Sequence, residues 1–123
     1  MLSIGRFGTR DIERAKSFYD QIAGLLGAQR IIGRPEMVGY RGAEGGTFII
    51  GKPFEGDATY GNGTQLGFMA PSRDAVNAVH AKALELGGKD EGAPGFRGPE
   101  EMAFYAGYFR DLDGNKMIVF RQG

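Results

Sequence analysis

Few residues of this sequence belong to the types that perform catalysis. The chain has no cysteine and a single histidine, His80. Cysteine nucleophiles, thiolate metal sites, disulfides and any site that needs two histidines are therefore excluded. His80 stands beside Val76 and Val79 in a helical pattern, which indicates a histidine on the flank of a helix without a catalytic task; a role in binding or pH response is the open alternative. A Ser–His–acid triad would have to recruit it from the helix-covered side of a sheet, which the geometry disfavours.

Three oxygen-bearing side chains near the C-terminus have the spacing of the first ligands of a calcium loop: Asp111, Asp113 and Asn115. The sixth position of such a loop should be glycine and is Lys116, and the twelfth should be glutamate and is Gln122. An Asp-Gly pair between two β-rich runs is instead typical of a tight hairpin turn. We therefore predict a hairpin, whose register decides which way the side chains of the last strand point.

Composition limits the class of protein and its partners. A chain of 123 residues is long enough for one domain with a core and too short for two ordinary ones. Lysine plus arginine equals aspartate plus glutamate, 15 each, and the basic residues are scattered, so neither nucleic acid nor a membrane surface is an expected partner. No apolar run approaches the ~20 residues of a membrane span. We expect a cytoplasmic protein, in which the 22 glycines mark tight turns of a β-rich fold.

The residues above must be positioned by two similar runs of elements. In the first, residues 2–9 predict a strand, and Asp11 predicts the N-cap of a helix that ends at Gly24 and Gly27. Three short strands then follow, at 28–33, 37–41 and 47–51. The turn-rich connection 52–63 is predicted to wall a site, with a simple linker as the open alternative.

The second run begins with a strand at 64–70 and a helix capped by Ser72 and ended by Gly87-Gly88. A strand near 89–93, a loop and the closing hairpin 105–120 complete it. The segments Thr9-Arg10-Asp11 and Ser72-Arg73-Asp74 indicate an internal duplication. We predict a single α+β domain of two β-α-β-β-β modules, about 1–60 and 61–123. They form one curved mixed β-sheet with helices on its outer face and the other face open.

Paired modules of this kind, together with two motifs, resemble the vicinal oxygen chelate superfamily of glyoxalase I, bleomycin-resistance proteins and extradiol dioxygenases. The segment Gly8-Thr9-Arg10-Asp11-Ile12-Glu13-Arg14-Ala15-Lys16-Ser17-Phe18-Tyr19 resembles the first-helix signature of that superfamily. The segment Phe109-Arg110-Asp111-Leu112-Asp113-Gly114-Asn115-Lys116 resembles its terminal hairpin, with Leu112 where proline is usual. The resemblance covers the whole chain and implies a homodimer.

Enzymes of that superfamily hold a divalent metal with four histidine or glutamate side chains on the open face of the sheet. The resemblance places those positions near Ile4, within Phe48-Ile49-Ile50, at Gln65 and at Ile118. Only Gln65 could coordinate, weakly, through its amide oxygen, whereas divalent ions need imidazole, carboxylate or several oxygens. We therefore expect no metal and no cofactor at this site.

The open face remains as a candidate site for a small molecule. Strand alternation puts Gln65 on it, and Ile118 and Arg6 share it on the last and first strands. An apolar cleft with a few polar groups is typical of ligand sites. We predict no catalytic residue, and six ligand-binding residues: Arg6, Tyr40, Phe48, Gln65, Tyr105 and Ile118. Packing of these residues against a second subunit, or against one another, is the open alternative.

Two functions follow from this pattern. The first is a metal-independent protein of the bleomycin-resistance type that binds a small, partly apolar molecule in the open sheet cleft. The alternative is a glyoxalase-like lyase or dioxygenase whose divalent metal site has moved, which requires at least three converging ligands.

Overall fold

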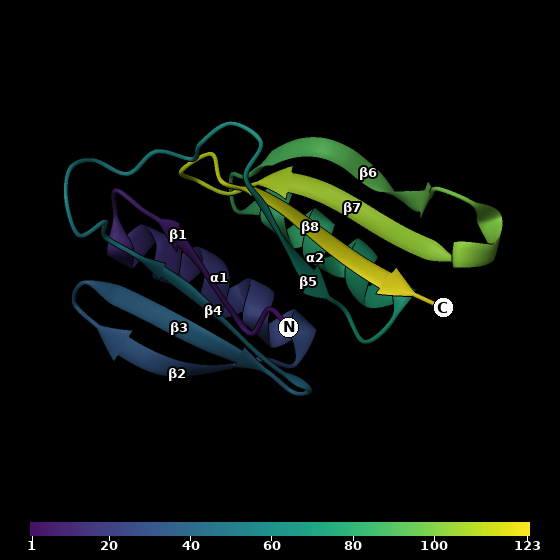
Figure 1. Ribbon diagram of the computed structural model, residues 1–123, viewed down its shortest axis with the longest axis horizontal. Helices are drawn as coiled ribbons and strands as arrows, with labels where there is room; N and C mark the ends of the chain where they lie inside the picture. Colours follow the sequence, from purple (N-terminus) through teal and green to yellow (C-terminus); the bar gives the residue numbers. More distant parts are fainter.

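The computed structural model of the protein describes residues 1–123. Two runs of elements follow each other along the chain (Figure 1). The predicted α+β class and the two β-α-β-β-β modules are confirmed. The first module contains β1 (Ile4–Gly8), α1 (Ile12–Leu26), β2 (Gln29–Arg34), β3 (Met37–Gly42) and β4 (Gly45–Gly51). The second contains β5 (Gln65–Met69), α2 (Arg73–Glu85), β6 (Lys89–Arg97), the 3₁₀ turn η1 (Glu100–Met102), β7 (Phe104–Arg110) and β8 (Lys116–Gln122).

The backbone ladders divide the strands into two mixed sheets of four strands each, where one continuous sheet was predicted. Their orders are β1-β4-β3-β2 and β5-β8-β7-β6, with β1 parallel to β4 and β5 parallel to β8. The sheets meet along β1 and β5 through side chains: a Cβ added to Gly5 would lie 2.8 Å from Leu66 Cδ1. We call this boundary the seam.

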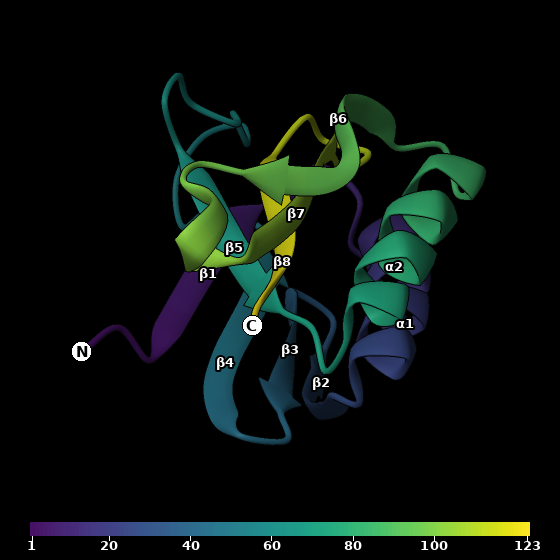
Figure 2. The same ribbon diagram turned by 90° about the vertical axis from the view of Figure 1, so that its right-hand side faces the viewer.

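Both helices lie on the same side of the two sheets (Figure 2) and pack against each other. Asp11 caps α1 by accepting a hydrogen bond from the Arg14 amide, and Ser72 caps α2 by accepting one from the Ala75 amide, as predicted. Gly27 caps the C-terminal end of α1. Its φ of 71° is a left-handed conformation that favours glycine. Gly24, predicted to help end this helix, lies within it.

One hydrophobic core lies between the helices and the sheets and joins the two modules. Rings of Phe48 and Phe68 meet across the seam at 5.1 Å between centroids, and Tyr19 of α1 lies 4.8 Å from Phe48. Val76 and Val79 of α2 belong to the same buried cluster. A module of about 60 residues buries little apolar surface by itself. The shared core therefore lets each module bury apolar residues against the other. Neither helix has the length and apolar character needed to cross a bilayer.

Two details differ from the sequence-based expectation. The strand predicted at 89–93 continues to Arg97 through Pro94, which is tolerated because β6 is an edge strand with two register shifts. The two helix caps, Asp11 and Ser72, are structural counterparts. Thr9 therefore corresponds to Ala70, and not to Ser72 as the repeated Arg-Asp pair suggested.

The closing hairpin has the predicted register. Gly114 takes φ 87° in the turn between β7 and β8, a conformation that favours glycine. Met117 and Val119 enter the core, and Ile118 pairs with Gly67 on the face away from the helices. A Cβ added to Gly67 would lie 3.0 Å from Ile118 Cγ2, so both positions point to the open face.

Candidate functional site

Three of the six predicted ligand-binding residues, Arg6, Gln65 and Ile118, belong to the open face. They do not converge on one another. Gln65 pairs with Lys116, at the far end of β5 from Met69. The Arg6 guanidinium donates to the carbonyl of Lys52 at 2.7 Å, which holds it against the connection between the modules.

The other three predicted residues, Tyr40, Phe48 and Tyr105, point towards the helices, so their assignment to the open face was wrong. The Tyr40 hydroxyl donates to Asp20 of α1 at 2.7 Å, and burial followed by this carboxylate raises the pKa of Tyr40 above its usual value. Phe48 is a core residue. The Tyr105 hydroxyl donates to Asn77 of α2 at 2.6 Å.

The protein has no group of three histidine, cysteine, aspartate or glutamate side chains that could hold a metal ion. Ile4, Gln65 and Ile118 occupy the positions at which the resemblance implied ligands. His80 lies on the helix side, where its Nε2 is 3.0 Å from Asp90 Oδ1 and 3.1 Å from the Tyr108 carbonyl. The amide of Gly92 and His80 bind the Asp90 carboxylate, and they lower its pKa.

A cavity of about 560 Å³ opens at the seam, between α1 and the ends of β1 and β5. We call it the seam cavity. Most of its wall is apolar, and its two charged lining residues are Glu44 and Arg121. Tyr40 and Phe48 line it, whereas Arg6, Gln65, Tyr105 and Ile118 do not. Its further walls come from Tyr19, Ile22 and Leu26 of α1, Leu66 to Met69 of β5, and the β3–β4 turn Gly42–Gly46.

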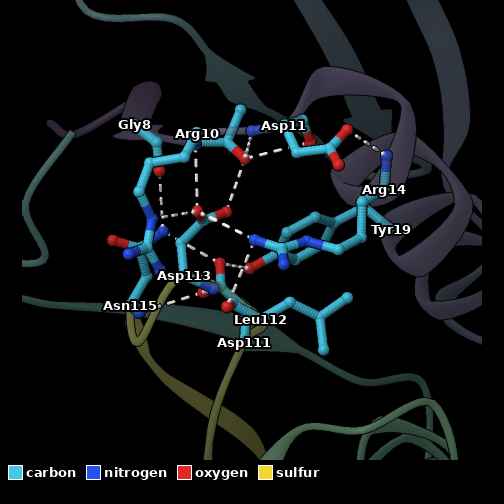
Figure 3. A network of polar contacts seen from close by, with 10 residues as sticks. Gly8, Arg10, Asp11, Arg14, Tyr19, Asp111, Leu112, Asp113 and Asn115 are labelled. Atoms are coloured by element: carbon cyan, nitrogen blue, oxygen red, sulfur yellow. Dashed lines mark hydrogen bonds and ion pairs between the residues drawn. The ribbon is translucent and has the colours of Figure 1, made fainter. Parts of the chain in front are cut away.

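At the opposite end of the molecule, the equivalent space is closed by a buried polar network (Figure 3). Asp113 of the β7–β8 turn accepts hydrogen bonds from the Thr9 hydroxyl, the Arg10 amide and the Arg14 guanidinium. Asp111 accepts one from the Tyr19 hydroxyl at 2.6 Å. The turn is thereby bound to the start of α1, and no buried polar side-chain atom is left without a partner.

Burial shifts the titration of two members of this network. It raises the pKa of the Asp111 carboxyl, against hydrogen bonds from Tyr19 and Asn115 that lower it. Burial, and then the charge of Asp111, raise the pKa of the Tyr19 hydroxyl well above its usual value of 10.0. The phenol therefore stays a neutral donor to a higher pH than an exposed tyrosine would.

The internal duplication explains why one end is closed and the other is hollow. The counterparts of Thr9, Arg10 and Arg14 in the second module are Ala70, Pro71 and Ala75, aligned through the two helix caps. Alanine has no hydroxyl and proline no amide N–H, so none of the donors to Asp113 has an equivalent. The β3–β4 turn, Gly42–Gly46, offers one carboxylate, on exposed Glu44. Because Ala70, Pro71 and Ala75 supply no such donors to bind the β3–β4 turn, the space beside Ala70 and Pro71 stays open as the seam cavity.

Sequence reasoning missed Arg121 and Glu44 as cavity residues. The signal for Arg121 was the alternation of β8, because Met117 and Val119 face the core and Arg121 is the next residue on that side. Glu44 had no comparable signal, since a glycine-rich turn does not specify its direction.

The chain matches the glyoxalase/bleomycin resistance protein/dioxygenase superfamily over residues 4–119. It belongs to that superfamily. A glyoxalase/bleomycin resistance protein from Albidiferax ferrireducens T118 is 38% identical, with 98% of each chain covered and a TM-score of 0.89. Among curated proteins, none matches the chain.

Solved structures of lower sequence identity share the fold. A family enzyme from Burkholderia phytofirmans PsJN is 21% identical over 97% of this chain and 96% of its own, with a TM-score of 0.73. Lactoylglutathione lyase from Agrobacterium tumefaciens is 18% identical over 98% and 92%, with a TM-score of 0.68. The predicted resemblance is thus confirmed for family and fold, and a shared fold does not by itself specify the chemistry of the site.

Proposed function

We propose that this superfamily member binds a small, partly apolar molecule in the seam cavity and does so without a metal ion. The seam cavity carries the proposal, because its volume of about 560 Å³ lies within the range of small-molecule sites. A mostly apolar wall with two charged side chains supplies burial for a ligand body and polar contacts to orient it. We therefore keep the ligand class that was predicted from the sequence, and we propose the seam cavity as its site in place of the open face.

The alternative, a glyoxalase-like lyase or dioxygenase with a relocated metal, requires at least three converging ligand side chains. The residues do not fit this requirement, because the protein has no such group. Homodimerisation and a cytoplasmic location remain predictions that follow from the family and the composition.

Binding is tested with N-phenyl-1-naphthylamine, a neutral aromatic probe whose fluorescence rises in apolar surroundings. We expect saturable binding with one site per chain. Ala28 lines the cavity, so Ala28→Trp should fill part of it and weaken binding tenfold or more. Ala78 is exposed on α2 and does not line the cavity, so Ala78→Trp serves as the matched control.

Both variants are first shown to unfold cooperatively in urea, so that a loss of binding is not a loss of fold. Absence of saturable binding to the unmodified protein would refute the proposal. Equal affinity of Ala28→Trp and the unmodified protein would place the probe elsewhere and refute the site.

A further inference from the structure

We infer that the ligand of the seam cavity is a singly charged organic anion, with an apolar body and a carboxylate or similar group that binds Arg121. This inference rests on the proposed function, because it specifies the ligand of the same cavity. Three observations support it: the position of the Arg121 side chain in the cavity wall, the absence of a carboxylate partner for its guanidinium, and the apolar side chains around it.

Arg121 reaches the cavity from the core side of the sheet. It stands near the end of β8 (Lys116–Gln122), where alternation after Met117 and Val119 directs its side chain towards the helices. Its guanidinium Nη1 lies 3.5 Å from the carbonyl of Ala70, another residue of the cavity wall. The group is thus half-buried at the wall and not extended into solvent.

The Arg121 guanidinium has no anionic partner. None of the protein's ion pairs includes it, whereas Arg10, Arg14, Arg30 and Arg110 each contact a carboxylate. A guanidinium has five N–H donors, and the long contact to Ala70 uses one of them. Glu44, the other charged residue of the wall, lies on the exposed β3–β4 turn and makes no ion pair with Arg121.

The rest of the wall determines the body of the ligand. Side chains of Ile22, Leu26, Phe48, Leu66 and Phe68 present hydrocarbon to the cavity. No lysine or histidine lines it, so Arg121 is its single cationic group. A dianion would leave charge uncompensated among these residues, at a desolvation cost, whereas one carboxylate matches the two-pronged geometry of a guanidinium.

A pair of probes that differ by one charge tests this inference. 8-Anilinonaphthalene-1-sulfonate is N-phenyl-1-naphthylamine with an added sulfonate, so the apolar body is constant. We expect the anion to bind at least tenfold more tightly than the neutral probe. Arg121→Gln should abolish that preference and leave the affinity for the neutral probe unchanged. Arg121→Lys keeps the charge but not the fork of donors, and should retain part of the preference.

Lys116→Gln is the matched control, because Lys116 lies over the Tyr108 ring on the open face, forms no ion pair and does not line the cavity. It removes the same net charge and should leave both affinities unchanged. An equal loss in Lys116→Gln and Arg121→Gln would assign the preference to net charge and overturn the role of Arg121.

The outcomes separate this inference from the proposed function. Equal binding of both probes to the unmodified protein would leave cavity binding in place and refute the anionic ligand. Failure of both probes to bind would refute the proposed function itself. Competition by 1-naphthoate, with no effect of 1-naphthamide, would extend the result from sulfonates to carboxylates, and equal competition by the two would contradict it.

Discussion

The hydroxyl of Thr9 donates a hydrogen bond to the carboxylate of Asp113, 104 residues further along the chain. The contact joins the start of the first helix to the last turn, and its counterpart in the internal duplication, Ala70, cannot form it. The two ends of a twofold arrangement therefore differ by a few polar atoms. One end is closed by hydrogen bonds and the other contains the seam cavity.

Thr9→Val should lower the free energy of unfolding by about 1–3 kcal/mol, because it leaves buried polar partners short of a hydrogen bond. The Thr9 hydroxyl also accepts from the Asp11 amide, so the N-cap turn of α1 loses support as well. Urea denaturation measures the change. Thr64→Val, at an exposed position, is the control and should change stability by less than about 0.5 kcal/mol. Equal effects of the two substitutions would contradict a stabilising network.

Two glycine-to-alanine substitutions should change stability in opposite directions. Gly114→Ala should destabilise by about 1 kcal/mol or more, because φ is 87° and the new Cβ would lie 2.8 Å from Tyr60 Cδ1. Gly24→Ala lies in α1 with no atom within 4 Å of the added Cβ, and should stabilise by about 0.5–1 kcal/mol. Thermal unfolding measures whether each variant raises or lowers the unfolding temperature. A change in the same direction for both would show that backbone conformation does not determine the effect of these substitutions on stability.

Alkaline pH should destabilise the protein partly through Tyr19. Burial raises the pKa of its hydroxyl well above the 10.0 of the unfolded chain. Above pH 10.0 the unfolded state therefore binds fewer protons than the folded state, so stability falls as pH rises. Tyr19→Phe should remove up to about 1.4 kcal/mol per pH unit of this slope. Urea midpoints at pH 9, 10 and 11 compare the slopes, and parallel curves would show that Tyr19 does not cause the loss.

Removal of divalent ions should leave the protein unchanged. The protein has no group of three histidine, cysteine, aspartate or glutamate side chains that could hold a metal ion, so we expect folding to be independent of ion binding. The unfolding temperature of protein purified without a histidine tag should be the same with and without EDTA. Added Zn²⁺, Ni²⁺ or Mn²⁺ should not raise it. A stoichiometric ion that survives purification and raises the unfolding temperature would contradict this expectation.

Local sequence signals predicted most of the fold. Asp11 and Ser72 cap the helices as expected, and the Asp113-Gly114 pair sets the register that places Ile118 on the open face. Helix caps and tight turns are determined by residues that are close together in the sequence, so local motifs predict them. The break between the sheets was not predicted, because it depends on how the Leu66 side chain packs against the backbone of Gly5 across the seam.

The candidate site was harder to predict because several strands carry large side chains on both faces. In β7, Tyr105 faces the helices and Tyr108 the open face, so alternation of polarity does not separate the two sides. In β4, Phe48 enters the core while the adjacent Ile49 does not. The seam cavity was also inaccessible to sequence reasoning, because it arises from contacts that the β3–β4 turn fails to make.

The hydrogen bonds from Thr9 and Tyr19 to Asp113 and Asp111 affect how the protein can be synthesised. When the first module leaves the ribosome, its acceptors at 111 and 113 have not yet been translated. The helix can form, but the hydroxyl groups of Thr9 and Tyr19 have no native partner until Asp111 and Asp113 have been synthesised. The first module therefore cannot complete its native contacts before the second module has been synthesised, and truncation before the last turn should release a first module prone to aggregation.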